Sequence, residues 1–158
     1  MSNVGWAKSI LEKVFSAGVD EIILCPGARN APFVEALSQW KSGKLYSFFE
    51  ERSAAFFALG RIAQIRRPVA VITTSGTAVA NLLPAMVEAH YAGLPLLAIT
   101  ADRPKSFRGT GSPQTIIQPG IFSSYAKFLG DLEKGDEWTG EIQTSSHLNV
   151  CFDEPLVD

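Results

Sequence analysis

The run Val69-Ala70-Val71-Ile72-Thr73-Thr74 constrains the fold of this chain more than any other segment. It is apolar at nearly every position and rich in β-branched side chains, without a regular polar alternation. Strands that are buried on both faces of a parallel sheet have this pattern, because helices cover both sides of such a sheet. We therefore expect a parallel sheet enclosed by helices, and the neighbouring segments should supply those helices.

Helix-like and strand-like segments alternate along the chain, separated by short connections such as Gly18 and Pro26-Gly27. The predicted helices cover residues 4–17, 30–40 (capped by Asn30), 51–66 and 77–91, and the predicted strands cover 21–25, 45–49, 69–74, 94–100, 124–132 and 147–152. This order predicts an α/β fold with a doubly wound, open parallel sheet and helices on both faces. We expect residues 1–158 to form a single domain. Residues 105–118 should form a long loop over the sheet edge, and residues 135–146 a surface excursion.

The helix predicted around residues 54–65 has an unusual surface. It is polar only at Arg61 and Gln64, although a helix on one face of a sheet normally carries a solvated stripe. We expect a second apolar neighbour, most simply another subunit, and a thick core is the competing explanation. The helix over residues 77–91 is nearly as apolar, and Pro84 should kink or split it.

Four unusual local sequences follow directly after predicted strands. Since ligands of open parallel sheets bind at the carboxyl ends of the strands, this clustering predicts a binding site at that edge. Gly, Pro, Ser and Asp are also ordinary turn residues, which is the alternative explanation for each segment alone. The four segments are 25–30 (Cys-Pro-Gly-Ala-Arg-Asn), 50–52 (Glu-Glu-Arg), 74–77 (Thr-Ser-Gly-Thr) and 100–104 (Thr-Ala-Asp-Arg-Pro).

Glu50 and Glu51 follow the apolar pair Phe48-Phe49 and precede an apolar helix. Burial penalises an ionised carboxylate, so a glutamate at this position should either find a partner or hold its proton. A carboxyl group poised between its two protonation states is suited to proton transfer. Alternatively, both glutamates only begin a helix, where negative charge is favourable.

Other candidate residues could bind an anionic or polar ligand. Ser75-Gly76-Thr77 at a helix start offers backbone N–H groups, although a plain helix cap explains it as well. Arg29 and Arg103 can each grip a carboxylate with two hydrogen bonds, and Gln114 and Gln118 are possible amide contacts. The sequence contains neither a phosphate-binding Gly-x-x-x-x-Gly-Lys nor a Gly-x-Gly-x-x-Gly motif.

The composition excludes little but gives no support for several classes of partner. With a net charge of −2 and 46% hydrophobic residues, the chain lacks the basic balance of proteins that bind nucleic acid or anionic membranes. No segment has the length of a membrane span, and the first residues lack the layout of a signal peptide. Cys25 and Cys151 match no metal or redox spacing. We expect a cytoplasmic protein with no metal ligands of its own.

Several motifs together resemble the N-terminal, pyrimidine-binding domain of the 2-succinyl-5-enolpyruvyl-6-hydroxy-3-cyclohexene-1-carboxylate synthases. That family comprises thiamine-diphosphate enzymes of menaquinone biosynthesis, and the resemblance runs nearly from end to end. The matching stretches are Pro26-Gly27-x-Arg29, Glu51-Arg52-Ser53-Ala54-x-Phe56-Phe57-Ala58-Leu59-Gly60, Thr74-Ser75-Gly76-Thr77-Ala78-x-Ala80-Asn81, Leu83-Pro84-Ala85-x-Val87-Glu88-Ala89, Thr100-Ala101-Asp102-Arg103-Pro104, Gln114-x-Ile116 and Leu148-Asn149-Val150-x-Phe152-x-Glu154-Pro155-Leu156.

The resemblance implies a function for the carboxyl edge. Glu51 would be the catalytic glutamate that hydrogen-bonds the aminopyrimidine ring of thiamine diphosphate and exchanges a proton with it. The reaction implied is decarboxylation of 2-oxoglutarate followed by addition to isochorismate. The other cofactor contacts would be Pro26, Gly27, Thr74, Ser75 and Gly76, and the substrate contacts would be Arg29, Arg103 and Gln114.

The resemblance also implies that this chain is part of a larger assembly. It would be the N-terminal part of a three-domain enzyme, whose ligands for Mg²⁺ and the diphosphate lie outside this sequence. A homodimer or higher homo-oligomer would complete the site with the diphosphate-binding domain of a neighbouring subunit. We therefore expect the isolated chain to be inactive.

The sequence departs from the family pattern at Cys25, Ala28 and Asn30, where the family usually has serines, and at Glu50, where it usually has Asp. The missing hydroxyl group at Ala28 removes a possible hydrogen bond to the substrate. Two alternatives stay open at this point. The chain could be a free-standing pyrimidine-binding subunit of a split thiamine-dependent 2-oxo-acid decarboxylase, or a flavodoxin-like binding domain without catalytic activity.

Overall fold

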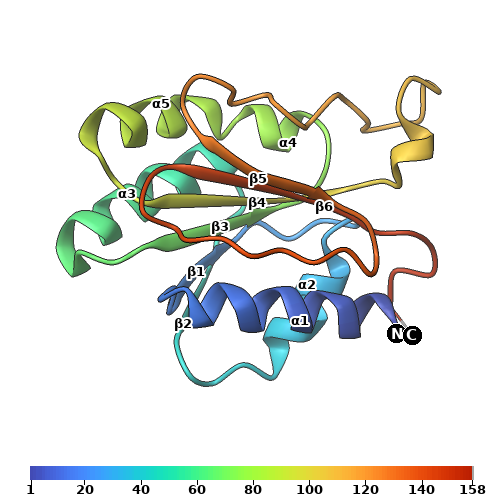
Figure 1. Ribbon diagram of the computed structural model, residues 1–158, viewed down its shortest axis with the longest axis horizontal. Coiled ribbons are helices and arrows are strands. Elements are labelled where there is room, and N and C mark those ends of the chain that lie inside the picture. Colours follow the sequence, from blue (N-terminus) through green and yellow to red (C-terminus); the bar gives the residue numbers. More distant parts are fainter. Residues whose placement is uncertain (158) are drawn as a thin grey trace.

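The β-branched run forms β3 (Val69–Thr73), which lies inside a six-stranded sheet (Figure 1). The computed structural model describes residues 1–157. The strand order is β2-β1-β3-β4-β6-β5, and every neighbouring pair is parallel. The other strands are β1 (Glu21–Leu24), β2 (Lys44–Ser47), β4 (Leu96–Asp102), β5 (Lys127–Leu132) and β6 (Ser146–Cys151). The predicted doubly wound α/β fold is confirmed.

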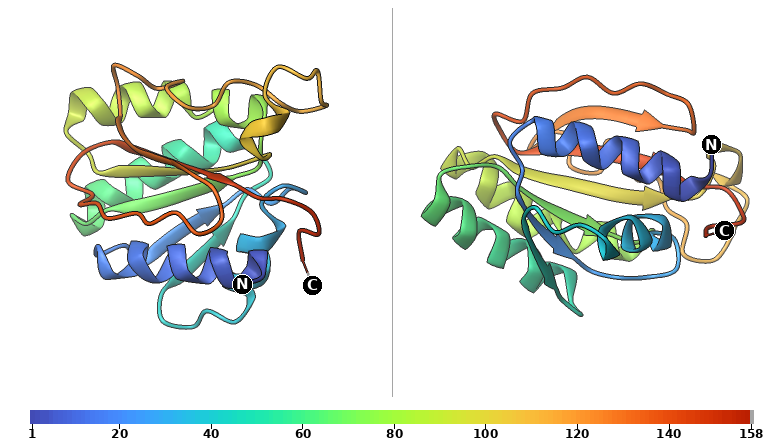
Figure 2. Two further views of the ribbon diagram at one scale, coloured as in Figure 1. Left: turned by 45° about the vertical axis from the view of Figure 1, so that its right-hand side comes forward. Right: turned by 90° about the horizontal axis from the view of Figure 1, so that it is seen from below.

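Helices cover both faces of the sheet, as Figures 1 and 2 show. α1 (Asn3–Ser16) and α2 (Ala31–Ser38) lie on one face, and α3 (Glu51–Ile65), α4 (Thr77–Ala80) and α5 (Leu83–Ala92) lie on the other. Successive strand residues point to opposite faces, so Ile22 belongs to the core beneath α1 and α2 while Ile23 belongs to the core beneath α3 and α5. Both faces of the central strands β1, β3 and β4 are therefore buried, which explains why these strands are apolar at nearly every position.

Pro84 splits the helix predicted for residues 77–91, as expected. α4 ends at Ala80 and α5 begins at Leu83, so the proline occupies the first turn of a new helix, where its missing N–H is tolerated. Several strand boundaries differ from the prediction. β2 ends at Ser47 rather than at residue 49, and β4 begins at Leu96 rather than at residue 94. β4 continues to Asp102 because β6 pairs with it as far as Cys151, and β5 begins at Lys127 because the chain before it forms turns.

The outer surface of α3 and α5 carries exposed aromatic side chains. Phe49, two residues before α3, is fully exposed, Phe56 on α3 is 43% exposed, and Tyr91 on α5 is 77% exposed. A thick core does not explain these side chains, since they face solvent within residues 1–157. Coverage by another subunit stays a prediction. Among the described helices, none combines the length and apolar character needed to span a membrane.

Candidate active site at the carboxyl edge of the sheet

The segments after β1 and β3 pack against each other at the carboxyl edge of the sheet. A Cβ atom on Gly27 would lie only 2.6 Å from the Cβ atom of Thr74, so the backbone of Gly27 lies against the Thr74 side chain and leaves no room for a side chain of its own. The backbone N–H of Arg29 donates a hydrogen bond to the hydroxyl group of Thr74 over 3.2 Å. The structure thus brings Pro26-Gly27 beside Thr74, as the sequence predicted.

The two adjacent glutamates have different environments. Glu50 is the N-cap of α3, and its carboxylate accepts hydrogen bonds from the backbone N–H groups of Arg52 (2.9 Å) and Ser53 (2.7 Å). Glu51 lies in the first helical turn, is half-buried, and makes no hydrogen bond or ion pair with any of residues 1–157. The helix-start explanation therefore holds for Glu50, and the carboxylate of Glu51 remains available to a ligand.

Both glutamates follow β2, which pairs with β1, so they lie near Cys25 at the carboxyl end of β1. Burial raises the pKa of the Cys25 thiol to about 12, and the negative charges of Glu51 and Glu50 add to this effect.

The turn at Ser75-Gly76 is tied to the loop between β4 and β5. The prediction that its backbone N–H groups are free is wrong for Gly76, whose N–H donates to Oε1 of Gln118 over 2.9 Å. Gln114 lies against the same turn, because its side chain donates to the carbonyl of Ser75 and its own carbonyl accepts from the Ser75 hydroxyl, both over 3.0 Å. The turn and Gln114 thus form one unit.

The two candidate arginines lie on the same edge but have different partners. Arg29 is buried, and its guanidinium donates to the carbonyl of Phe152 (3.1 Å) and pairs with the carboxylate of Glu154 (3.1 Å). Arg103 donates to the carbonyl of Pro113. Arg29 therefore already binds a carboxylate, that of Glu154, whose side chain is 66% exposed.

The structure also shows a polar cluster that the sequence did not predict. Arg108 binds both oxygens of Asp131 over 2.7 and 2.8 Å, and it reaches Asp102 over 3.1 Å. Burial would raise the pKa of Asp131, but the hydrogen bonds from Arg108 and Asn149 outweigh burial and leave this pKa below its ordinary value. Polar residues inside otherwise apolar strands, such as Asn149, were the signal that could have indicated this cluster.

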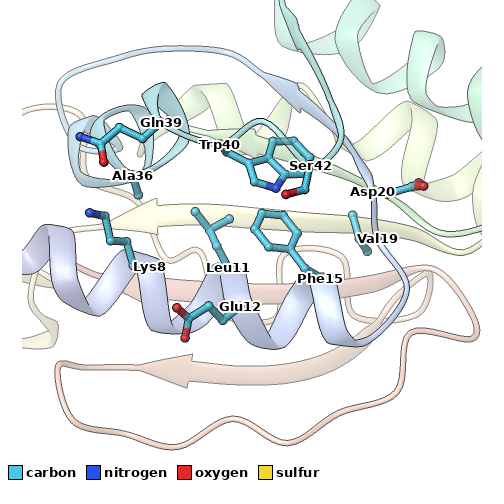
Figure 3. A pocket seen from close by; sticks show the side chains of 10 residues that line it. All are labelled: Lys8, Leu11, Glu12, Phe15, Val19, Asp20, Ala36, Gln39, Trp40 and Ser42. Carbon is cyan, nitrogen blue, oxygen red and sulfur yellow. The ribbon is translucent and has the colours of Figure 1, made fainter.

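A separate cavity of about 430 Å³ lies between α1 and α2 (Figure 3). Its floor includes the stacked rings of Phe15 and Trp40, whose centroids are 4.6 Å apart. Val19 and Ser42, which also line it, precede β1 and β2. This cavity therefore lies near the amino ends of the strands, opposite the candidate site.

The sequence profile of a known family matches residues 6–121 of this chain, which include Glu51, the Ser75-Gly76 turn and Gln114. The family is described as thiamine pyrophosphate enzyme, N-terminal TPP binding domain. The chain belongs to the thiamine pyrophosphate enzyme family. The cofactor of this family is thiamine pyrophosphate, which is also called thiamine diphosphate.

Relatives within the thiamine pyrophosphate enzyme family are similar over the whole chain. The chain is 55% identical to the 2-succinyl-5-enolpyruvyl-6-hydroxy-3-cyclohexene-1-carboxylate synthase of Bdellovibrio bacteriovorus, with 100% of this chain and 31% of the relative covered. It is 45% identical to the synthase of the same name from Akkermansia muciniphila, and 40% identical to that from Halobacterium salinarum, with 98% of this chain and 30% of each relative covered. The chain thus spans about a third of the length of these synthases.

Proposed function

We propose that this chain is the pyrimidine-binding domain of a cytoplasmic thiamine-diphosphate-dependent 2-succinyl-5-enolpyruvyl-6-hydroxy-3-cyclohexene-1-carboxylate synthase, and that Glu51 is its catalytic glutamate. The observation that carries this proposal is the carboxylate of Glu51 at the sheet edge, which has no partner among residues 1–157, within a chain of this family. The identity of up to 55% with synthases favours this function over a subunit of a split decarboxylase.

The residues at the edge suit the cofactor. Gly27 and Gly76 present backbone without side chains. Because Glu50 caps the helix, the carboxyl group of Glu51 is available to the cofactor. We assign contacts with the cofactor to these residues and to Pro26, Thr74 and Ser75. When bound, thiamine diphosphate supplies the electron sink for breaking the bond between the carbonyl and carboxyl carbons of a 2-oxo acid.

The roles of the protein residues follow from their chemistry. Glu51 hydrogen-bonds the pyrimidine ring through its carboxyl group and carries a proton to or from the ring nitrogen. Arg29 and Arg103 bind carboxylate groups of the substrate, because a planar guanidinium matches a carboxylate. Gln114, which is fixed to the Ser75 backbone, offers its remaining amide atoms to the substrate.

The rest of the site belongs to other parts of the enzyme. The proposed substrates are 2-oxoglutarate and isochorismate, and the ligands of Mg²⁺ lie outside this sequence. A homodimer or higher homo-oligomer would bring a diphosphate-binding domain onto this edge, and we expect the exposed side chains of Phe49, Phe56 and Tyr91 to lie in subunit contacts. We expect the isolated chain to show no carboligation.

The test is Glu51→Gln in the intact enzyme that contains this chain, with Glu50→Gln as the matched control. Loss of isochorismate in the presence of 2-oxoglutarate measures the reaction. Glu51→Gln should lower kcat by about 10²- to 10⁴-fold, because an amide cannot relay the proton. Glu50→Gln should retain most of the activity, because its amide oxygen can still accept from one of the two N–H groups at the start of α3. Unchanged activity of Glu51→Gln would overturn the catalytic assignment.

A further inference from the structure

Gln118 is fully buried in the loop between β4 and β5, and its whole amide group is hydrogen-bonded. Its Oε1 accepts from the N–H of Gly76 over 2.9 Å. Its Nε2 donates to the carbonyl of Ala101 over 3.2 Å and to Oδ1 of Asn149 over 2.8 Å. One side chain thus connects the turn after β3 with the carboxyl-terminal part of β4 and with β6.

Asn149 on β6 is equally buried and equally saturated. Its Oδ1 accepts from Gln118 and from the hydroxyl of Thr100, the latter over 2.7 Å. Its Nδ2 donates to Asp102 over 3.0 Å and to Asp131 over 2.8 Å. Because two carboxylates can only accept, the nitrogen of Asn149 must face them and its oxygen must face Gln118. That orientation in turn requires Gln118 to present its nitrogen to Asn149 and its oxygen to Gly76.

The same network anchors the loop that carries Gln114. Arg108, near the beginning of this loop, binds the carboxylates of Asp102 and Asp131, and Gln118, ten residues further along, binds Asn149. Gln114 lies between these two anchors. The buried amide groups of Gln118 and Asn149 have every polar atom hydrogen-bonded, so these two side chains favour one arrangement and hold the attached backbone in one geometry.

We propose that Gln118 and Asn149 are positioning residues, which together fix the Ser75-Gly76 turn and Gln114 for binding of the cofactor and the substrate. This inference rests on the proposed function of the edge. Gln118 acts on the turn directly through Gly76. Asn149 acts through Gln118, because it dictates which way the Gln118 amide points.

The test compares Gln118→Glu with Gln118→Met in the intact enzyme at pH 6 and pH 8. The introduced carboxyl group keeps an acceptor for Gly76, but when ionised it places an oxygen against the two acceptors on Ala101 and Asn149. When protonated it can donate to Asn149 again. Burial raises the pKa of a carboxyl group, which brings its titration toward the chosen range. The methionine has no comparable acceptor and no titrating group.

The charged and titratable groups around this position do not obscure the comparison. Asp102 is paired with Arg108. Burial lowers the pKa of His147 to about 3, so this imidazole is neutral at both pH values. Asp131 has a lowered pKa, and burial raises the pKa of the Cys151 thiol far above this range. The groups that face the network are Asp102 on β4, Lys105 and Arg108 between β4 and β5, Asp131 on β5, and His147 and Cys151 on β6.

We expect Gln118→Glu to lower kcat/KM, with thiamine diphosphate as the varied ligand, by about 10- to 100-fold at pH 8, the range for a buried group that loses its partner. At pH 6 its activity should recover to within about threefold of wild type. Gln118→Met should be impaired at both pH values. Ser145→Ala, which removes a buried hydrogen bond to Tyr125 at the opposite edge of the sheet, should lower the melting temperature without changing kcat/KM.

The inference is overturned if both Gln118 variants retain wild-type kcat/KM at both pH values. It is also overturned if their losses only follow the folded fraction, measured by circular dichroism at the assay temperature, as in Ser145→Ala. Failure of the proposed function has a different signature. In that case the wild-type enzyme would not require thiamine diphosphate, and Glu51→Gln would be as active as wild type.

Discussion

Gly76→Ala tests whether the turn beneath the candidate site has the backbone geometry described above. Gly76 has φ +81° and ψ −141°, a conformation that costs a residue with a side chain about 1–3 kcal/mol. The added Cβ would lie 2.8 Å from Cγ of Gln114 and 3.0 Å from its carbonyl oxygen. Because that oxygen belongs to the main chain, Gln114 must shift and weaken its two hydrogen bonds with Ser75, each contributing about 1 kcal/mol.

The expected loss in the free energy of unfolding of Gly76→Ala is about 3–5 kcal/mol. Urea unfolding of the 158-residue chain, followed by the fluorescence of the buried Trp6 and Trp138, measures it. The matched control is Gly135→Ala, where φ is +100° but no atom lies within 4 Å of the added Cβ. It should lose only the backbone contribution, about 1–3 kcal/mol.

The difference between the two variants isolates the contact with Gln114. If Gly76→Ala is no less stable than Gly135→Ala, the turn does not pack against Gln114 as described. If both variants are as stable as wild type, the argument from backbone strain is refuted as well. In the intact enzyme, Gly76→Ala should also weaken binding of thiamine diphosphate, as isothermal titration calorimetry can measure.

Three further predictions concern stability and substrate binding. Gly60→Ala should raise the free energy of unfolding by about 0.5–1 kcal/mol in urea titrations, because Gly60 lies within α3 and its added Cβ meets no atom within 4 Å; a loss of stability would contradict this. Arg108→Met should cost about 3 kcal/mol in the same assay, since it leaves the fully buried Asp102 without its cation; a neutral effect would show that the pair is not needed. Glu154→Ala should lower the KM for isochorismate about two- to fivefold, because an exposed ion pair no longer competes for Arg29; an unchanged or raised KM would argue against carboxylate binding by Arg29.

The fold could be predicted from the sequence because its signals are local. The apolar run at residues 69–74 forms a buried strand, and Gly18, Pro26 and Pro84 lie where a helix or strand ends or begins. Each of these signals acts within a few residues. The order of the strands was less accessible. Nothing in the sequence near β5 or β6 indicates that β6 inserts between β4 and β5, because that pairing depends on packing across the whole sheet.

The candidate site was predictable to a similar degree. The gathering of segments at the carboxyl edge follows from the topology of a parallel sheet, so Gly27 and Thr74 could be expected to meet. The partners of individual polar groups could not be expected. Gln118 accepts a hydrogen bond from the N–H of Gly76, which lies 42 residues earlier in the chain. Glu154 forms an ion pair with Arg29, which lies 125 residues earlier.

The assignment of catalysis to Glu51 rather than Glu50 follows from the position at which α3 begins. Glu50 has extended backbone angles (φ −120°, ψ 126°), so its side chain folds back onto the first N–H groups of the helix, as an N-cap does. Hydrogen bonds from the Ser53 hydroxyl and from the backbone of Ser53 and Arg52 lower the pKa of Glu50. A carboxylate held in its ionised form is a poor carrier of protons near neutral pH. The side chain of Glu51, one residue further along, has no such partners among residues 1–157, and we therefore propose it as the carboxyl group that exchanges a proton with a ligand at this edge.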